Sequence, residues 1–100
     1  MTRLVITPRA QDDLERLADF LLERNVEDAL QTQAVILDAL RILQHQARVG
    51  RPAGGPLREL VIHRGRSGYL ALYHWDEGAD VALVLAIRHQ RESGYHDDDL

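Results

Sequence analysis

The chain of 100 residues contains no cysteine and no lysine. Without cysteine there are neither disulfide bonds nor thiolate ligands for a metal ion, which fits a reducing compartment. No apolar stretch approaches the ~20 residues that a membrane-spanning helix needs. The first residues, 1–6, lack the long apolar region and the small-residue cleavage site of a secretory signal. These absences predict a cytoplasmic protein.

Sequence patterns for binding a metal ion or a nucleotide are missing as well. The five histidines and the carboxylates do not occur at the HExxH spacing or at a comparable one. The glycine-rich segment 50–55 precedes a predicted strand, whereas a phosphate-binding loop opens a helix. We therefore expect no metal ion and no other cofactor.

The charges are divided unevenly along the chain, and all twelve cations are arginine. Residues 1–47 carry five arginines against eight carboxylates, whereas residues 48–91 carry seven arginines against four carboxylates. Residues 92–100 add four carboxylates and no cation. The basic middle block predicts an anionic target or an acidic partner. Genome composition explains the lack of lysine equally well, but it does not explain the clustering.

The first half of the chain has the pattern of one strand and two helices. Residues 3–6 predict a short strand, after which Thr7 offers an N-cap oxygen and Pro8 suits the first helical position. Apolar residues at helical spacing continue to Leu22 and predict an amphipathic helix. Asn25 can cap a second helix with a wider apolar stripe that continues to Leu43. Because few residues join them, the two helices should form an antiparallel hairpin.

The second half has the pattern of strands. Three glycines and two prolines within residues 48–56 predict a loop. Residues 57–64, 69–75 and 81–88 then predict three strands, joined by short connections that contain glycine. The expected fold is therefore α+β, in the order β-α-α-β-β-β, with the helical hairpin packed on one face of a small, mainly antiparallel sheet. We expect one domain over residues 1–100, with a disordered tail at 96–100.

Strand alternation predicts which side chains share a face of the sheet. Tyr69, Tyr73 and Trp75 should point to one face, where packing in the core or against a partner is the simplest role for them. Leu70 and His74 should point to the other face, which we expect to be partly open. His63 should also point there.

Several segments, in this order and spacing, resemble the RelE/ParE toxins of bacterial type II toxin–antitoxin systems, a group that includes plasmid stabilisation proteins. They are GRPAGGPLRELVIHRGRSGYLALYHW and VALVLAIRHQRESGY, with Gly50-Arg51-Pro52, Arg58-Glu59-Leu60, Tyr69 to Tyr73 and Arg88-His89-Gln90-Arg91 as the most specific parts. Ala10, Asp13 and Leu14 also stand where such toxins have a similar helix motif. The resemblance covers nearly the whole chain.

The resemblance implies two different activities and one partner. RelE-like toxins cut messenger RNA on the ribosome without a metal ion, by activating a ribose 2′-hydroxyl. ParE-like toxins bind DNA gyrase and have no established chemistry of their own. Both kinds are held inactive by an antitoxin. We expect a growth-inhibiting toxin and favour gyrase as its target, with the ribosome-dependent endoribonuclease and an inactive, antitoxin-binding relative as alternatives.

The resemblance also supplies candidate site residues. Tyr95 matches the C-terminal tyrosine of the nuclease, Arg91 lies just before it, and His89 takes the place of a catalytic arginine. His63 falls near a lysine of the nuclease, so His63 and His89 would be an acid/base pair. Leu70 stands where the nuclease has an essential arginine, which weighs against RNA cleavage.

The remaining candidates are cations near the strand ends, and three of them have a plain structural alternative. The predicted target-binding residues are Arg51, Arg58, Arg64, Arg66 and Arg88. Arg58 would serve equally well in an ion pair with a helix carboxylate. For Arg64 and Arg66, the simpler role is that of solvated charges beside a turn. A purely structural role, in which the packed Tyr95 side chain anchors the C-terminal tail, would suit Tyr95 equally well.

Overall fold

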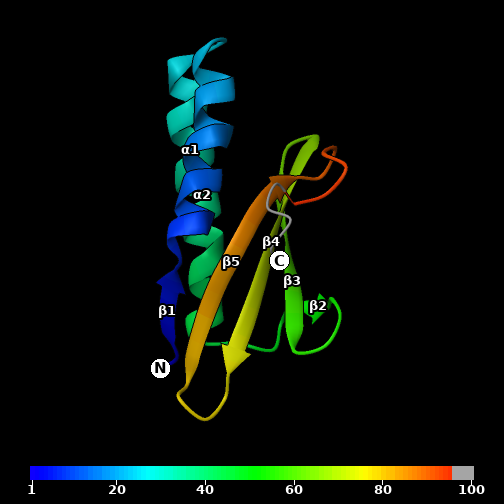
Figure 1. The fold of residues 1–100 in the computed structure, drawn as a ribbon. Helices are drawn as coiled ribbons and strands as arrows, with labels where there is room; N and C mark the ends of the chain where they lie inside the picture. Colours follow the sequence, from blue (N-terminus) through cyan, green and yellow to red (C-terminus); the bar gives the residue numbers. More distant parts are fainter. Residues whose placement is uncertain (96–100) are drawn as a thin grey trace.

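The computed structural model describes residues 1–95 and has the expected α+β architecture, with a helical hairpin beside a five-stranded sheet (Figure 1). The predicted disordered tail at 96–100 lies outside the described residues. The sheet order is β1-β5-β4-β3-β2. Strand β1 runs parallel to β5, and the other neighbours are antiparallel. No helix within the described range is long and apolar enough to cross a membrane.

The two helices begin where the capping residues predict. Helix α1 (Pro8–Leu22) follows β1 (Arg3–Ile6), and the Thr7 hydroxyl accepts a hydrogen bond from the Ala10 amide at 3.3 Å. Helix α2 (Val26–Leu40) is capped by Asn25, whose side-chain oxygen accepts a hydrogen bond from the Asp28 amide at 3.1 Å. The apolar pattern beyond Leu40 continues as a 3₁₀ turn, η1 (Arg41–Gln44).

The three predicted C-terminal strands are present, and a short fourth one precedes them. They are β3 (Leu57–Arg64), β4 (Ser67–Asp76) and β5 (Val81–His89). Strand β2 (Arg51–Pro52) lies inside the predicted loop and pairs with Arg58 and Glu59 of β3. It was missed because proline and glycine indicate a loop, although proline is tolerated in an edge strand such as this one.

The core lies between the hairpin and one face of the sheet. Tyr69 and Tyr73 of β4 point into it, as alternation predicts, and pack with Leu14, Ile36 and other apolar side chains of both helices. A bulge in β5 leaves Leu85 between the pairs Tyr73–Val84 and Leu72–Ala86. Because of this extra residue, Val84 and Ile87 both point into the core although they are three positions apart.

Helix α1 covers the edge of β5 that β1 leaves open. Strand β1 ends at Ile6, opposite Val84, so the next part of β5 has no strand on that side. The buried carboxylate of Asp13 accepts a hydrogen bond from the Ile87 amide there at 2.8 Å. This bond fixes the direction in which β5 continues toward the candidate residues at its end.

Candidate functional site

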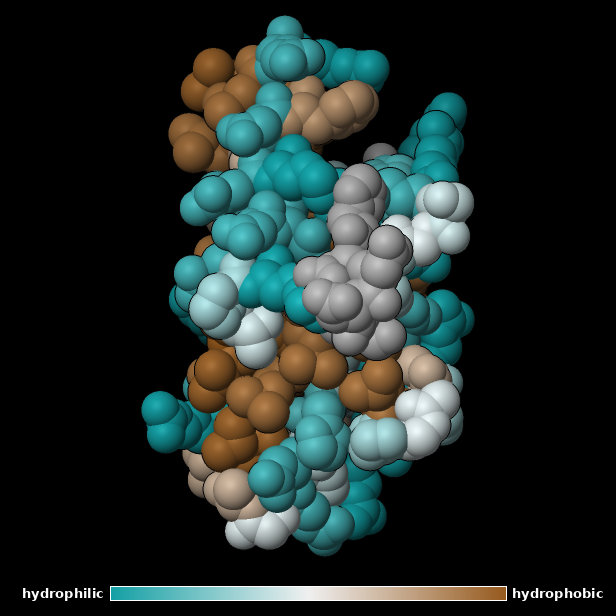
Figure 2. Space-filling view, in the orientation of Figure 1, coloured by the Kyte–Doolittle hydropathy of each residue, from teal (hydrophilic) through white to brown (hydrophobic). Residues whose placement is uncertain are grey.

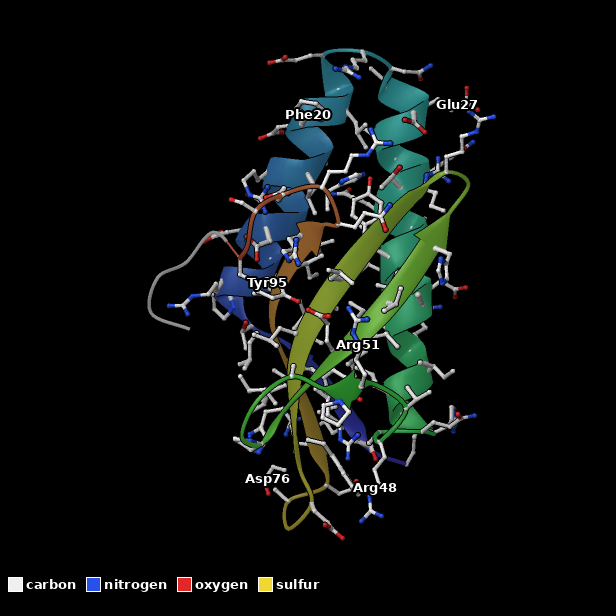
Figure 3. All side chains as sticks on the ribbon, turned by 90° about the vertical axis from the view of Figure 1, so that its right-hand side faces the viewer. Phe20, Glu27, Arg48, Arg51, Asp76 and Tyr95 are labelled. Carbon is white, nitrogen blue, oxygen red and sulfur yellow. The ribbon has the colours of Figure 1, made fainter. Side chains whose placement is uncertain are left out.

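The sheet face away from the helices carries a cluster built around Tyr95 (Figure 3). The Tyr95 hydroxyl donates a hydrogen bond to Glu59 of β3 at 2.7 Å, and Arg88 of β5 lies over its ring at 5.2 Å. Arg51 of β2 donates two hydrogen bonds to the other Glu59 oxygen. Glu59 and Arg88 belong to the strands on either side of β4, so Tyr95 crosses β4. Both residues face Tyr95 because they alternate onto this side of the sheet.

Beneath Tyr95, the sheet is apolar. Leu70 and Leu72 of β4 are the cross-strand partners of Arg88 and Glu59, respectively, and both leucines are buried. This part of the second face is therefore covered, whereas Val61 and His63 of β3, on the same face, are exposed, so the face as a whole is partly open. Leu70, which occupies the position of the nuclease's essential arginine, is part of this apolar floor and offers no charge to a phosphate.

The surroundings of Tyr95 and Glu59 shift the pKa values of the two groups in opposite directions. Burial and the hydrogen bond to Glu59 raise the pKa of the Tyr95 phenol, so the phenol remains protonated near neutral pH. Burial acts to raise the pKa of Glu59, but hydrogen bonds from Tyr95 and Arg51 outweigh it and lower that pKa. Glu59 therefore remains a carboxylate, and it accepts the hydrogen bond from the Tyr95 hydroxyl. Neither group is set to exchange a proton at neutral pH.

The Arg88 guanidinium forms hydrogen bonds with backbone carbonyls of the turn that follows β5. Its guanidinium donates a hydrogen bond to the Glu92 carbonyl at 2.6 Å and weaker ones to the carbonyls of His89 and Gln90. Its Nε is buried without a hydrogen-bond partner among the described residues. Arg88 therefore holds the turn that carries the chain from β5 back to Tyr95.

The two candidate histidines lie on opposite faces of the sheet. His89 pairs with Tyr69 across β4 and β5, and their rings meet edge-on at 5.2 Å on the core side. His63 is paired with Gly68, one position away from Tyr69, so its exposed side chain is on the other side. The structure therefore does not bring His63 and His89 together as an acid/base pair.

His63 is also remote from Tyr95 along the same face. Four positions of β3 separate it from Glu59, the hydrogen-bond partner of Tyr95. That separation corresponds to about 13 Å of strand. Arg91 is exposed, and its backbone amide donates a hydrogen bond to His89 Nδ1 at 3.1 Å. The four predicted catalytic residues thus do not converge on one point.

The predicted target-binding arginines have different structural partners. Arg58 donates hydrogen bonds to the carbonyls of Arg48 and Gly50, at 3.1 and 2.8 Å, so it holds a loop rather than a helix carboxylate. Arg64 forms an ion pair with Asp28 of α2 at 2.6 Å. Arg66 is exposed in the turn between β3 and β4, and the Arg51 side chain is also mostly exposed. Arg51 and Arg66 are thus the more accessible of these cations.

A groove on the helical side brings together residues that the sequence patterns had left apart. It has a volume of about 670 Å³ and lies between the distal half of α1 and the end of β5. Figure 2 shows the surface hollowed between the upper end of the hairpin and the β3–β4 turn. The groove is lined by Arg16, Leu17, Phe20, Leu21, Arg24, Tyr69, His89, Arg91 and Glu92.

The sequence reasoning singled out His89 and Arg91 but missed the α1 side of this groove. Phe20 is 58% exposed although it is aromatic, and Arg24, one turn later, lies over its ring at 4.9 Å. The available signal was an aromatic residue outside the apolar stripe of an amphipathic helix. Arg16 is held by Glu92 at 2.9 and 3.1 Å, which joins α1 to the turn after β5.

Comparison with known proteins identifies relatives of nearly the full chain. The family model described as ParE toxin of type II toxin–antitoxin system, parDE, matches residues 4–94. The toxin RelE3 of Caulobacter vibrioides is 30% identical over 92 residues, which are 92% of this chain and 98% of that protein.

Solved structures of toxin–antitoxin complexes contain similar chains. A chain of the chromosomal ParDE system from P. aeruginosa is 25% identical, with a TM-score of 0.73 and coverage of 89% of this chain and 96% of that one. A chain of the RelBE2 complex from Mycobacterium tuberculosis is 22% identical, with a TM-score of 0.62 and coverage of 89% and 98%. The latter likeness concerns the fold alone.

Proposed function

The chain belongs to the ParE toxin family, within the RelE/ParE superfamily of type II toxin–antitoxin systems, and from that premise we propose that it inhibits DNA gyrase. Inhibition of gyrase would arrest growth until an antitoxin neutralises the toxin. A target of this kind implies action in the cytoplasm. The similar solved chains come from toxin–antitoxin complexes, which supports an antitoxin as the partner of this chain as well.

The observation that carries the proposal is the separation of the candidate catalytic groups. RNA cleavage by a 2′-hydroxyl needs a base, an acid and a cation around one phosphate. Here His89 is on the core side of the sheet, while Tyr95 is on the other side and hydrogen-bonded to Glu59. A surface that binds a protein target does not need these groups to meet. The arrangement therefore favours inhibition by binding.

Within this proposal, Tyr95 and Arg51 are target contacts. Both belong to the cluster on the sheet face away from the helices, and Arg51 is largely exposed. Arg66 in the neighbouring turn would extend the contact. Arg58, Arg64 and Arg88 would act indirectly, because each fastens a loop or hairpin that carries this surface.

One observation favours RNA cleavage as a second candidate. Tyr95 lies next to two cations, Arg88 over its ring and Arg51 across Glu59. A phosphate that displaced Glu59 would meet a phenol and two guanidinium groups. This alternative requires the Tyr95–Glu59 hydrogen bond to open, and no histidine joins the site without a larger rearrangement.

The test is a supercoiling assay with purified gyrase and purified toxin. We expect inhibition that rises with toxin concentration, falls when Arg51→Ala or Tyr95→Ala is used, and is unaffected by Leu30→Ala on α2. In parallel, the toxin is added to a translation reaction and the message is mapped by primer extension. Ribosome-dependent cuts that disappear in Tyr95→Phe, together with unaffected gyrase, would establish the nuclease instead. Inactivity in both assays, with antitoxin binding intact, would show instead that the chain is an inactive relative that only binds an antitoxin.

A further inference from the structure

We propose that two copies of this chain associate through the outer side of the helical hairpin, with α2 of one copy packed antiparallel against α2 of the other. The contact region, the hairpin surface, consists of Val26, Leu30, Ala34 and Leu37 of α2. The inference goes beyond the proposed function, because it concerns a second copy of the chain and neither gyrase nor an antitoxin.

The hairpin surface is an apolar row that the folded chain leaves in solvent. Val26 and Leu30 are 59% and 62% exposed, and Ala34 and Leu37 are exposed as well. Their spacing of four, four and three residues places them along one side of the helix, away from the side that faces the core. Figure 2 shows hydrophobic side chains gathered at the upper end of the hairpin, on the side away from the sheet. A continuous row of this kind indicates a contact surface.

The charges beside the row favour a second copy over an unrelated partner. Glu27 lies seven positions before Ala34, and Arg41 lies seven positions after it. Each charge is therefore about 10 Å from Ala34 along the helix. A two-fold axis at Ala34 places Glu27 of each copy opposite Arg41 of the other. Contact with an unrelated protein would not require the two charges to be equally far from the centre.

The apolar residues follow the same symmetry. Leu30 and Leu37 lie four positions before and three positions after Ala34, so they meet across the axis. Val26 and the exposed Ile42 of η1 lie eight positions away on either side. Ala34 itself is small, which allows the two helices to approach closely where they cross.

Both charges are available for this contact. Glu27 accepts a hydrogen bond from the Gln31 side chain at 3.3 Å and forms no ion pair with any of residues 1–95. Arg41 pairs with Asp38 at 3.5 Å, and the two side chains are 70% and 80% exposed. An ion pair as exposed as this one contributes little to stability. Arg41 can therefore turn to Glu27 of the other copy at little cost.

The charge of α1 determines which helix forms the contact. Its exposed side is acidic, with Asp12, Glu15 and Asp19. These carboxylates would repel Asp38 and Glu27 of a second copy. The second copy is therefore expected to pack on α2, where the apolar row and the complementary charges occur together.

The first test is the oligomeric state of the purified full-length toxin, measured by sedimentation equilibrium over a range of concentrations. We expect a mass that rises toward that of two chains as the concentration increases. Leu30→Glu should raise the dissociation constant of the dimer about tenfold or more. Val49→Glu, at an exposed apolar residue between η1 and β2, is the matched control and should stay within about twofold of wild type. Circular dichroism establishes that each variant is folded.

Charge reversal provides a sharper test. Glu27→Arg and Arg41→Glu should each weaken self-association about tenfold, because like charges then face each other twice in the dimer. An equimolar mixture of these two variants should form a mixed dimer. In the mixture, position 27 of each copy meets the opposite charge at position 41 of the other. Recovery in the mixture cannot arise from damage to the fold of either variant.

The possible results separate the inference from the proposed function. A wild type that remains a monomer at every concentration would overturn the inference, as would a dimer that Leu30→Glu and both charge reversals leave unchanged. The hairpin surface and the Tyr95 cluster lie on opposite sides of the sheet, so Leu30→Glu should inhibit gyrase as the wild type does. Loss of inhibition in Leu30→Glu would make the hairpin surface a target contact instead. A dimer that does not inhibit gyrase would overturn the proposed function and leave the inference intact.

Discussion

Tyr73 has its hydroxyl group in the core, where the hydroxyl donates a hydrogen bond to the Ala47 carbonyl at 2.7 Å. The same oxygen accepts a hydrogen bond from the Gly50 amide at 2.9 Å. Gly50 is needed here because a Cβ atom at this position would lie 2.5 Å from the tyrosine ring. A glycine that the sequence indicates only as part of a loop is thus the point where that loop closes onto the core.

We expect Tyr73→Phe to lower the free energy of unfolding by about 1–3 kcal/mol, because both backbone groups lose their buried partner. Urea unfolding followed by circular dichroism measures the change, with an unchanged m-value as the sign of two-state behaviour. A loss below about 0.5 kcal/mol would mean that water replaces the hydroxyl and that the loop does not depend on it.

Glu59 gives the site a pH dependence. Burial acts to raise the pKa of Glu59, but Tyr95 and Arg51 outweigh it and hold the pKa below the ordinary 4.5. A carboxyl with a lowered folded-state pKa stabilises the protein above its ordinary pKa, and this stabilisation is lost as the pH falls through the folded-state value.

Glu59→Gln should therefore be less stable than wild type near about pH 7, with a difference that shrinks below about pH 4.5. Thermal unfolding over a series of pH values measures this. Glu77→Gln is the control, because Glu77 forms only an exposed ion pair with Arg48. A difference for Glu59→Gln that stays constant with pH would contradict the assigned pKa.

At the scale of the elements, the sequence predicts the helices better than the edges of the sheet. Thr7 and Asn25 mark the helix starts because capping depends on local chemistry. The bulge at Leu85 and the pairing of Arg51 with Glu59 depend on how neighbouring strands pair, so the residues within one strand do not predict them. The opposite positions of His63 and His89 follow from this long-range register.

Asp13 shows how one side chain joins two elements. Its carboxylate accepts a hydrogen bond from the Ile87 amide of β5 and another from the Arg16 guanidinium at 3.3 Å. We expect Asp13→Ala to cost about 2–3 kcal/mol and Asp13→Asn less, because asparagine keeps one acceptor oxygen.

Urea unfolding measures the cost of the Asp13 changes, and hydrogen exchange should show faster exchange of the Ile87 amide in Asp13→Ala. The neighbouring Asp12→Ala is the control, because Asp12 is exposed and should change stability by less than about 0.5 kcal/mol. Equal effects at the two positions would show that helix propensity, rather than the bond to β5, determines the result.

For the whole molecule, counting charges along the sequence predicts the charge of the folded surface only in part. Most arginines of residues 48–91 bind their own chain: Arg48, Arg51, Arg58, Arg64 and Arg88 have carboxylate or carbonyl partners. Arg66 and Arg91 make no ion pair with any of residues 1–95. A count of cations therefore predicts a broader basic surface than folding produces. The family motifs identify the fold and the class of protein, but they do not identify which face each cation reaches.

The central claim is that this toxin acts on gyrase by binding, and the topology of a reporter plasmid tests it most directly. The toxin is induced in growing cells, and plasmid topoisomers are separated on chloroquine gels before growth stops. We predict a shift toward less negative supercoiling that is absent when the antitoxin is co-expressed. Unchanged topoisomers in cells that nevertheless stop growing and accumulate cut messages would contradict the account.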